Sequence, residues 1–404
     1  MKNEKFYHNE YIVLPILCAF EALFLIYAIS NLSISFYEAE IFYESDSLVG
    51  IITRAFTKLF GQNDYAVRAP FIILHFINCI LLYKVSKYLL KRRFDRVISV
   101  MLYMILPGTL ASSILVNMAG IIIFFTLLLI FFEEKNLKIP FYIILFITAF
   151  IDKSFFILYF CFFIYAFFYK KTFMAIVSIG LFAFMISFYN LGFEGKPKDY
   201  FLDTLGVFAA TFSPIVFLFF VYTIYRIWLK DSKNLLFFIA TTTFCATLLL
   251  SIRQKTALEM ILPYCIISTP LIIRAFFNSY RVRLPVFRKA HKFFAILALS
   301  VLLISSALII FNQSLYMIFF SQKPQKHFIY KYDVAKDLAK SLQDINVNCV
   351  NSGDEELNLR LKFYGINKCE KVEISQKFIE NFDKTIEISK YNVRIAKFYV
   401  KMIK

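Results

Sequence analysis

The stretch YIVLPILCAFEALFLIYAIS, residues 11–30, is the first of the apolar runs that decide the fold class of this chain. Its only charged residue is Glu21, and about 20 consecutive apolar residues are what a helix needs to cross a bilayer. No small-residue cleavage site precedes the polar segment that follows, so we expect a retained spanning helix and not a removed signal peptide. Comparable runs recur along the chain, which predicts an all-α polytopic membrane protein.

Composition supports this class and excludes another. The 404 residues are 59% hydrophobic and 18% charged, with a mean hydropathy of +0.65, whereas a soluble domain has about 45–50% apolar and about 25% charged residues. The formal charge of +17 would suit nucleic-acid binding. The basic residues, however, fall in short clusters between apolar runs, as expected for the cytoplasmic loops of a membrane protein.

We expect about 11 transmembrane helices within residues 1–320. The two expected spans within 138–169 are short. They either cross the membrane as two spans or form a re-entrant pair, and a re-entrant pair would invert the orientation of every later segment. The expected spans are 11–31, 69–90, 95–112, 114–132, 138–151, 154–169, 172–190, 209–229, 234–251, 258–277 and 292–312.

Orientation follows from the basic loops between the spans. The clusters around Lys91, Lys135, Lys170, Lys230 and Arg283 all lie on one side if the N-terminus is cytoplasmic. An odd number of spans then places the C-terminal region outside. For a protein of a bacterial inner membrane, that side is the periplasm. The bacterial assignment rests on the Lys, Ile, Phe and Asn bias of the chain and on the resemblance described below.

The first outside loop, residues 32–68, is long for a connection. Within it, apolar residues recur at helical spacing between Leu48 and Leu59. Ser45 or Ser47 can cap the start of a helix, and Gly61 can end it. We therefore expect an amphipathic helix over about 47–60, lying on the outer membrane surface.

A change in composition after residue 320 predicts a small periplasmic α/β domain over 321–404. Helical patterns cover 333–342 and 357–364, and strand patterns cover 347–350, 371–374 and 393–400. Cys349 and Cys369 lie at the edges of two of these strands and form either a disulfide or two free thiols. The other cysteines lie in apolar runs as packing residues, and no cysteine–histidine spacing resembles a zinc site.

Glu38 and Glu40 are the main candidates for chemistry. They lie in SFYEAEIFY, residues 35–43, just after the first apolar run. A carboxylate beside an aromatic cluster at a membrane edge is costly unless it forms an ion pair, binds a metal or transfers protons. In an extended segment the i,i+2 spacing would place both on one side. Either one could act as general base, and two could hold a divalent ion; the alternative is an ordinary solvated loop.

Basic residues on the outside are exceptions to the orientation rule. Those that abut span ends lie at the depth of a lipid head group, where Arg and Lys can bind phosphate; the alternative is interfacial snorkelling. The turn around 251–256 is very short, which favours phosphate binding by the two basic residues in it. The expected donor-phosphate ligands are Arg253, Lys255, Lys153, Arg68, Arg54 and Lys58.

The segment 37–70 resembles the start of the GT-C membrane glycosyltransferases, in the branch of protein O-mannosyltransferases and lipid A aminoarabinose transferases. That branch has an Asp-Glu-Ala-Tyr-Tyr type motif after its first span, and Glu38 with Glu40-Ile41-Phe42-Tyr43 occupies that place. A surface helix and a Phe-Gly-x6-Arg-x-Pro segment follow, matched here by residues 60–70. Weaker matches are Leu106-Pro107, Asp152-Lys153-Ser154 and Leu262-Pro263-Tyr264, so the resemblance covers roughly residues 11–277.

The resemblance implies a mechanism. An acidic residue of the first loop activates an acceptor, basic residues bind the departing lipid phosphate, and some members use a divalent metal. Two departures stand out: Ala39 replaces the first acidic residue of the usual pair, and Asn117 stands near where a second acidic residue opens the fourth span. Glu40 and Asn117 would be the ligands of a Mg²⁺ or Mn²⁺ ion.

We therefore expect a glycosyltransferase that moves a sugar from a polyprenyl-phosphate donor to a periplasmic acceptor, which is a glycolipid, a glycan or a protein. A transporter or flippase of polyprenol-linked glycan is the first alternative, and it predicts charges buried in mid-span. Glu21 and Glu259 are the main charges of that kind. An inactive scaffold is the second alternative, suggested by the missing acidic residue.

Overall fold

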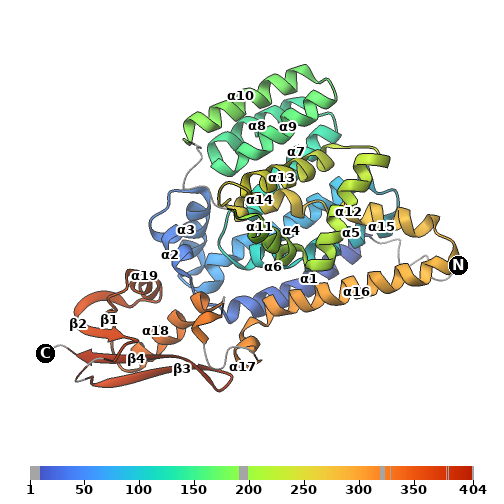
Figure 1. The fold of residues 1–404 in the computed structure, drawn as a ribbon. Coiled ribbons are helices and arrows are strands. Elements are labelled where there is room, and N and C mark those ends of the chain that lie inside the picture. The colour runs from blue at the N-terminus through green and yellow to red at the C-terminus, as the bar shows by residue number, and fades with distance from the viewer. Residues whose placement is uncertain are drawn as a thin grey trace. The chain divides into compact units, whose positions relative to one another are not determined.

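The computed structural model describes residues 10–190, 199–318, 324–327, 329–378, 380 and 382–402 (Figure 1). The chain is mostly helical and forms two compact units. The first unit comprises Met1–Ala22, Ile73–Ser113 and Met118–Ser306, and the second comprises Leu23–Ile72, Ile114–Asn117 and Ala307–Lys404. The first loop, expected to belong with the membrane domain, thus falls in the same unit as the C-terminal region.

The helices of the first unit follow the expected apolar runs. Helices α1 and α4 each run from one unit into the other. The bounds are α1 (Glu10–Ser30), α4 (Asp64–Leu89), α5 (Arg93–Ile105), α6 (Pro107–Ile114), α7 (Ala119–Glu134), α8 (Lys138–Ile151), η2 (Lys153–Phe155), α9 (Phe156–Phe168), α10 (Thr172–Phe188), α11 (Phe201–Phe212), α12 (Pro214–Lys230), α13 (Leu235–Ser251), α14 (Leu258–Ile266), α15 (Thr269–Val282) and α16 (Pro285–Ile310).

Among the described residues, four helices are long and apolar enough to cross a membrane: Ile12–Ser30, Asp64–Leu89, Leu258–Val282 and Pro285–Ile310. The number rises to six if each of two bent pairs is one span. Helices α5 and α6 bend by 61° and α11 and α12 by 104°. Both bends precede a proline, Pro107 or Pro214, which disfavours helical geometry in the residue before it. The expected spans 95–112 and 209–229 are therefore not straight helices.

Aromatic packing fills the core of the first unit. The ring of Phe244 on α13 meets Phe208 of α11 edge to face at 5.2 Å and Phe220 of α12 at 5.5 Å. Edge-to-face pairs of this kind add to the burial of large apolar area. These contacts hold α11, α12 and α13 together despite the sharp bend at Ser213, whose φ is +68°.

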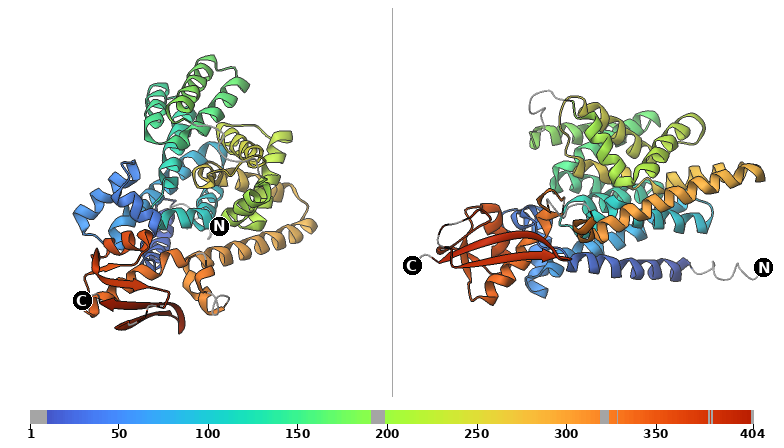
Figure 2. Two further views of the ribbon diagram at one scale, coloured as in Figure 1. Left: turned by 60° about the vertical axis from the view of Figure 1, so that its left-hand side comes forward. Right: turned by 60° about the horizontal axis from the view of Figure 1, so that its bottom comes forward.

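The second unit begins with the first loop and ends with the small domain. Its elements, besides the unit-two parts of α1 and α4, are α2 (Phe36–Tyr43), α3 (Leu48–Phe60), η3 (Asn312–Ser314), α17 (Leu315–Ile318), η4 (Pro324–Lys326), η5 (Tyr330–Tyr332), α18 (Val334–Asp344), β1 (Cys349–Asn351), α19 (Glu355–Phe363), β2 (Asn367–Ser375), β3 (Lys384–Lys390) and β4 (Val393–Met402). Figure 2 shows these strands from two further sides.

The four strands form one sheet in the order β1-β2-β4-β3. Strands β1 and β2 are parallel and are joined by α19, whereas β2/β4 and β3/β4 are antiparallel. Ile386 and Ile388 lie opposite Phe398 and Ala396, and all four are buried against the apolar side chains of α18 and α19. The expected α/β domain is confirmed in its elements, and β3 is an additional edge strand.

Cys349 and Cys369 form a disulfide, with their Cα atoms 5.4 Å apart. The bridge joins β1 to β2, so it closes a twenty-residue separation at one side of the sheet. A small domain with a limited core gains stability from such a crosslink.

Candidate functional site

The segment that carries Glu38 and Glu40 is a short helix, α2, and not an extended strand. Ser35 caps it: its Oγ accepts the Glu38 backbone N–H at 3.2 Å, while the Glu38 carboxylate accepts the Ser35 N–H at 2.9 Å. This reciprocal pair is a capping box. In a helix, side chains two residues apart point in different directions. The expectation that both carboxylates share one side is therefore wrong: Glu38 is buried and Glu40 is half-buried.

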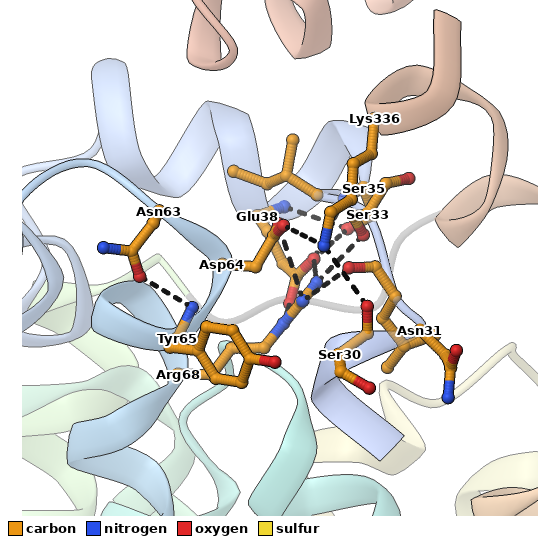
Figure 3. Close-up of polar contacts among 12 residues, drawn as sticks. Ser30, Asn31, Ser33, Ser35, Glu38, Asn63, Asp64, Tyr65, Arg68 and Lys336 are labelled. Carbon is orange, nitrogen blue, oxygen red and sulfur yellow. Dashed lines mark hydrogen bonds and ion pairs between the residues drawn. The ribbon is translucent and has the colours of Figure 1, made fainter. Parts of the chain in front are cut away.

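Glu38 forms a buried ion pair with Arg68 of α4 (Figure 3). Arg68 Nε lies 3.2 Å from Glu38 Oε1, and Nη2 lies 2.8 Å from Oε2, so the contact is bidentate. The backbone N–H of Val116 also donates to Oε1 at 3.1 Å. Both carboxylate oxygens are fully engaged, which makes Glu38 a positioning residue that fixes α2.

Arg68 has no nitrogen left for a phosphate. Its Nη1 donates to the Leu32 carbonyl and its Nη2 also donates to the Ser33 carbonyl, and the side chain is 1% exposed. The structural role therefore replaces the phosphate role expected from the sequence. The reason is the buried acidic partner: an arginine removed from water is stable only where its charge and donors are satisfied.

Asp64 extends this network toward the C-terminal segments of the same unit. Its Oδ1 accepts the Tyr364 hydroxyl at 2.6 Å, and its Oδ2 pairs with Lys336 Nζ at 3.0 Å. Figure 3 shows Lys336 reaching Asp64 from α18. Burial and the neighbouring Asp64 raise the pKa of Tyr364, so its phenol stays protonated and donates. Its oxygen in turn accepts the Ile34 N–H at 2.8 Å.

Arg360 of α19 completes the support of the first loop. Its Nε donates to the Ile34 carbonyl at 2.8 Å, and its Nη2 donates to Ser33 Oγ at 3.2 Å. Burial lowers the pKa of Arg360, but an arginine guanidinium keeps its charge at neutral pH. The backbone before α2 is thus held by Arg68 and Arg360 together.

Glu40 differs from Glu38 in having an available carboxylate. It is half-buried, and no hydrogen bond or ion pair engages its side chain within the described part of the chain. It lies on a helix that Glu38 fixes two residues earlier. A half-exposed carboxylate on a rigid support can accept a proton from a ligand that approaches it.

Helix α3 confirms the predicted helix after α2. It runs from Leu48 to Phe60, Ser47 caps it by accepting the Gly50 N–H, and Gly61 ends it with a φ of +83°. Gly50 is required for the close approach of α2, because a Cβ there would lie 2.8 Å from the Ile41 carbonyl oxygen. Ile51, Leu59 and Phe60 are exposed, so an apolar face remains uncovered, as the predicted surface helix requires.

The two basic residues of α3 have different environments. Arg54 Nη1 donates to the carbonyls of Phe42 and Ser45 at 3.2 and 2.7 Å, which ties α3 to the end of α2. Lys58 is exposed. Of the two, Lys58 keeps its whole ammonium group available to a ligand.

In the first unit, Lys153, Arg253 and Lys255 lie at one end of a helix pair. Helices α9 and α13 run antiparallel, because Cys161 contacts Thr243 at 3.3 Å while Tyr165, further along α9, packs edge to face against Phe238. Lys153 precedes α9 and the other two follow α13, so all three lie at the same end of the pair. All three side chains are exposed.

At this end of the helix pair, two of the segments that weakly match the family lie beside each other. The hydroxyl of Tyr264 donates to the Ser154 carbonyl at 3.0 Å. Asp152 caps the turn before α9 by accepting the Ser154 N–H at 2.7 Å. Segments about 110 residues apart in the chain are thereby fixed beside one another, and they hold the backbone that carries Lys153.

The proposed metal ligands lie in the second unit. Asn117 is half-buried, and its Nδ2 donates to the Leu115 carbonyl at 2.9 Å. Within the described ranges, the only group of three or more His, Cys, Asp and Glu side chains close enough to share a metal ion is Glu21, His75 and Cys79, in the first unit. Glu40 and Asn117 offer one carboxylate and one amide oxygen, a set that leaves most of a Mg²⁺ shell to water and substrate phosphate.

The network around Glu38 is not predicted by the sequence. The sequence pattern suggests a phosphate ligand at Arg68, and no motif singles out Asp64, Lys336, Arg360 or Tyr364. One signal was available: Ser35-x-x-Glu38 is a capping-box pattern and predicts a helix start. The long-range partners carry no local signal.

A cavity of about 600 Å³ lies elsewhere in the first unit, and it contains none of the predicted site residues. Helices α5, α12, α15 and α16 line it with mainly apolar side chains, and Ser279, Arg283 and His291 are its polar exceptions.

No protein-family model matches the chain, and no curated protein is similar to it in sequence.

Proposed function

We propose that this protein is a GT-C-like membrane glycosyltransferase that moves a sugar from a polyprenyl-phosphate donor to a periplasmic glycolipid, glycan or protein. The observation that carries the proposal is the contrast between two neighbouring carboxylates. The Glu38 carboxylate is fully engaged by Arg68 and by the cap of α2. Glu40 is half-exposed on the helix that these contacts hold in place. Glu40 is the proposed general base.

Glu40 would accept the proton of the acceptor hydroxyl or amine as that group attacks the anomeric carbon of the donor. The bond from this carbon to the phosphate oxygen breaks, and the lipid phosphate leaves with the electron pair. Rigid support matters here, because a small misplacement of a base lowers the rate strongly. The network from Glu38 through Arg68 to Asp64 supplies that support.

Basic side chains would bind the leaving phosphate. Arg253, Lys255 and Lys153 lie at one end of α9 and α13, and their positive charges suit a dianionic lipid phosphate. Lys58, on the exposed face of α3, would contact a lipid head group at the membrane surface. A Mg²⁺ or Mn²⁺ ion, where the reaction takes one, would find Glu40 and Asn117 as its ligands from this chain.

The proposed location is a bacterial inner membrane, with about 11 spans, a cytoplasmic N-terminus and a periplasmic C-terminal domain. The disulfide between Cys349 and Cys369 supports this side for the domain, because such bonds persist in oxidising compartments. The several long apolar helices are compatible with a membrane protein.

A reconstitution experiment tests the function. Lipid-linked sugars are extracted from cells that lack the gene, and the accumulating species is placed in liposomes with the purified protein and periplasmic acceptor fractions. We expect the sugar to appear on an acceptor and free polyprenyl phosphate to be released. Movement of the intact donor across the bilayer without cleavage would contradict the proposal and support the transporter alternative.

A further inference from the structure

A buried cluster in the first unit joins α1 to α4. His75 Nε2 lies 3.0 Å from Glu21 Oε1 and 3.8 Å from Cys79 Sγ. One donor atom from each of the three side chains lies within 4.8 Å of the other two. His75 and Cys79 are four residues apart on α4, so they share one face of that helix.

These distances suit a common metal ion. With metal–ligand distances of about 2.0–2.3 Å, the donor atoms of a tetrahedral site lie roughly 3.3–3.7 Å apart. The His75–Glu21 and His75–Cys79 separations of 3.0 and 3.8 Å lie just outside the two ends of this range, and all three separations are within 4.8 Å, so side-chain rotations could bring the donors onto one ion.

The cluster is buried but not fully satisfied. Glu21, His75 and Cys79 are 8%, 3% and 0% exposed. Glu21 Oε2 has no hydrogen-bond partner within the described part of the chain. A buried carboxylate oxygen without a partner is costly, and each such group in a native structure calls for an explanation.

Charge favours a divalent ion as that explanation. One carboxylate, one thiolate and a neutral imidazole around a dication form a site with no net charge, which an apolar interior tolerates far better than a lone anion. Binding requires the Cys79 thiol to release its proton, and the neutral imidazole coordinates through Nε2.

The surroundings hold the imidazole in place and keep the site dry. The Tyr103 ring of α5 stacks on the His75 ring, with the centroids 5.5 Å apart and the planes 12° apart. Phe76 packs edge to face against the same ring. An oriented ring loses little freedom on binding, as in metal sites whose outer partners fix the ligands.

We propose that Glu21, His75 and Cys79 bind a first-row transition-metal ion, with Zn²⁺ as the expected occupant. The set of one nitrogen, one sulfur and one oxygen donor suits Zn²⁺ and excludes Mg²⁺ and Ca²⁺, which take oxygen ligands. A water molecule completes the coordination. The site is independent of the proposed sugar transfer.

The ion would brace α1 against α4. Helix α1 packs little against the rest of the protein, since only 22% of its most apolar stretch is buried. A bond from Glu21 to a metal ion that two residues of α4 also bind would add a fixed contact between α1 and α4. The role is structural, so its loss should loosen α1 before it affects any other helix.

Metal analysis of the full chain tests the site. The protein is purified in detergent through a tag without histidines, exposed to Zn²⁺ and then passed through a chelating column. Elemental mass spectrometry should find about one zinc per chain in the wild type. Cys79→Ser and His75→Ala should retain at least about tenfold less. Cys161→Ser is the matched control, because that buried thiol contacts Thr243 and lies outside the group of Glu21, His75 and Cys79.

Cobalt gives a second readout that does not depend on affinity alone. Reconstitution with Co²⁺ should produce a sulfur-to-metal charge-transfer absorption in the wild type and in Cys161→Ser, and none in Cys79→Ser. Circular dichroism and gel filtration establish that each variant is folded. Loss of zinc on the chelating column by the folded wild type, or equal retention by wild type and Cys79→Ser, would overturn the proposal.

Discussion

Arg68 binds both carboxylate oxygens of Glu38, at 3.2 Å to Oε1 and 2.8 Å to Oε2, across a sequence separation of thirty residues. The pair is buried, and it links the start of α4 to the first turn of α2. Because Glu38 also caps α2, one ion pair fixes both the position and the beginning of the helix that carries Glu40.

Arg68→Ala should strongly destabilise the second unit. Removing one member of a buried ion pair leaves the other charge uncompensated and costs about 3–5 kcal/mol. Arg68→Lys should also destabilise it, since an ammonium cannot form the bidentate contact. Thermal unfolding followed by circular dichroism measures the effect. Lys58→Ala, at an exposed site on α3, is the control and should leave the unfolding temperature unchanged; an equally unchanged Arg68→Ala would refute the bracing role.

Asp333 should make the stability of the second unit depend on pH. It accepts hydrogen bonds from Tyr316 and Gln313, and burial raises the pKa of its carboxyl from 3.8 to about 6. The folded protein therefore holds this proton more tightly than the unfolded chain. The free energy of unfolding should fall as pH rises from about 4 to about 6, by on the order of 2–3 kcal/mol.

The Asp333→Asn variant isolates this contribution, because an amide does not titrate in that range. Its unfolding temperature should lose the part of the pH dependence that lies between about 4 and 6. Asp344→Asn, at the exposed end of α18, should retain the wild-type profile. Parallel profiles for wild type and Asp333→Asn would show that Asp333 titrates as an ordinary carboxyl.

Cys349→Ser should weaken the small domain by about 3 kcal/mol, the loop entropy that a crosslink over this separation removes from the unfolded chain. Limited proteolysis should then cleave the sheet region earlier than in the wild type. Cys245→Ser, at an exposed free thiol, should behave as wild type. Mass spectrometry after alkylation in intact cells should find Cys349 and Cys369 unalkylated, because the disulfide protects both. Alkylation of both thiols would contradict the disulfide and the proposed periplasmic side.

Replacing Arg253 and Lys255 together with Gln should raise the apparent KM for the lipid donor, and lower kcat if they stabilise the leaving phosphate. Arg253→Lys alone should also impair donor binding if its contact is bidentate. Lys138→Gln is a suitable control, because this exposed lysine begins α8, the helix that ends just before Lys153. A double variant with wild-type kinetics would remove these residues from the donor site.

Local patterns predicted much of the architecture. Apolar run length located the long helices, and the serine and glycine signals gave α3 with its cap at Ser47 and its end at Gly61. The β3 segment was missed, although Ile386 and Ile388 alternate with polar residues as in an edge strand with one buried face. The Leu106-Pro107 match was noted without the bend that proline introduces there.

The candidate site was harder to predict, because its decisive contacts are long-range. Nothing near Glu38 indicates that Arg68 and Val116 will engage both of its oxygens. Only the fold distinguishes Glu38 from Glu40. Likewise, the four-residue spacing of His75 and Cys79 is visible in the sequence, but Glu21 reaches them from another helix.

Glu40 is the proposed general base, and Glu38 is the residue that holds its helix in place. The direct measurement is the amount of lipid-linked sugar donor in cells that lack the gene and carry Glu40→Gln or Glu44→Gln at equal membrane abundance. Glu44, exposed one turn later at the end of α2, is the matched control. Loss of a general base slows the reaction by about 10²–10⁴-fold, so Glu40→Gln should accumulate the donor like the deletion while Glu44→Gln clears it. Clearance of the donor by Glu40→Gln at the wild-type rate would show that Glu40 is not the general base.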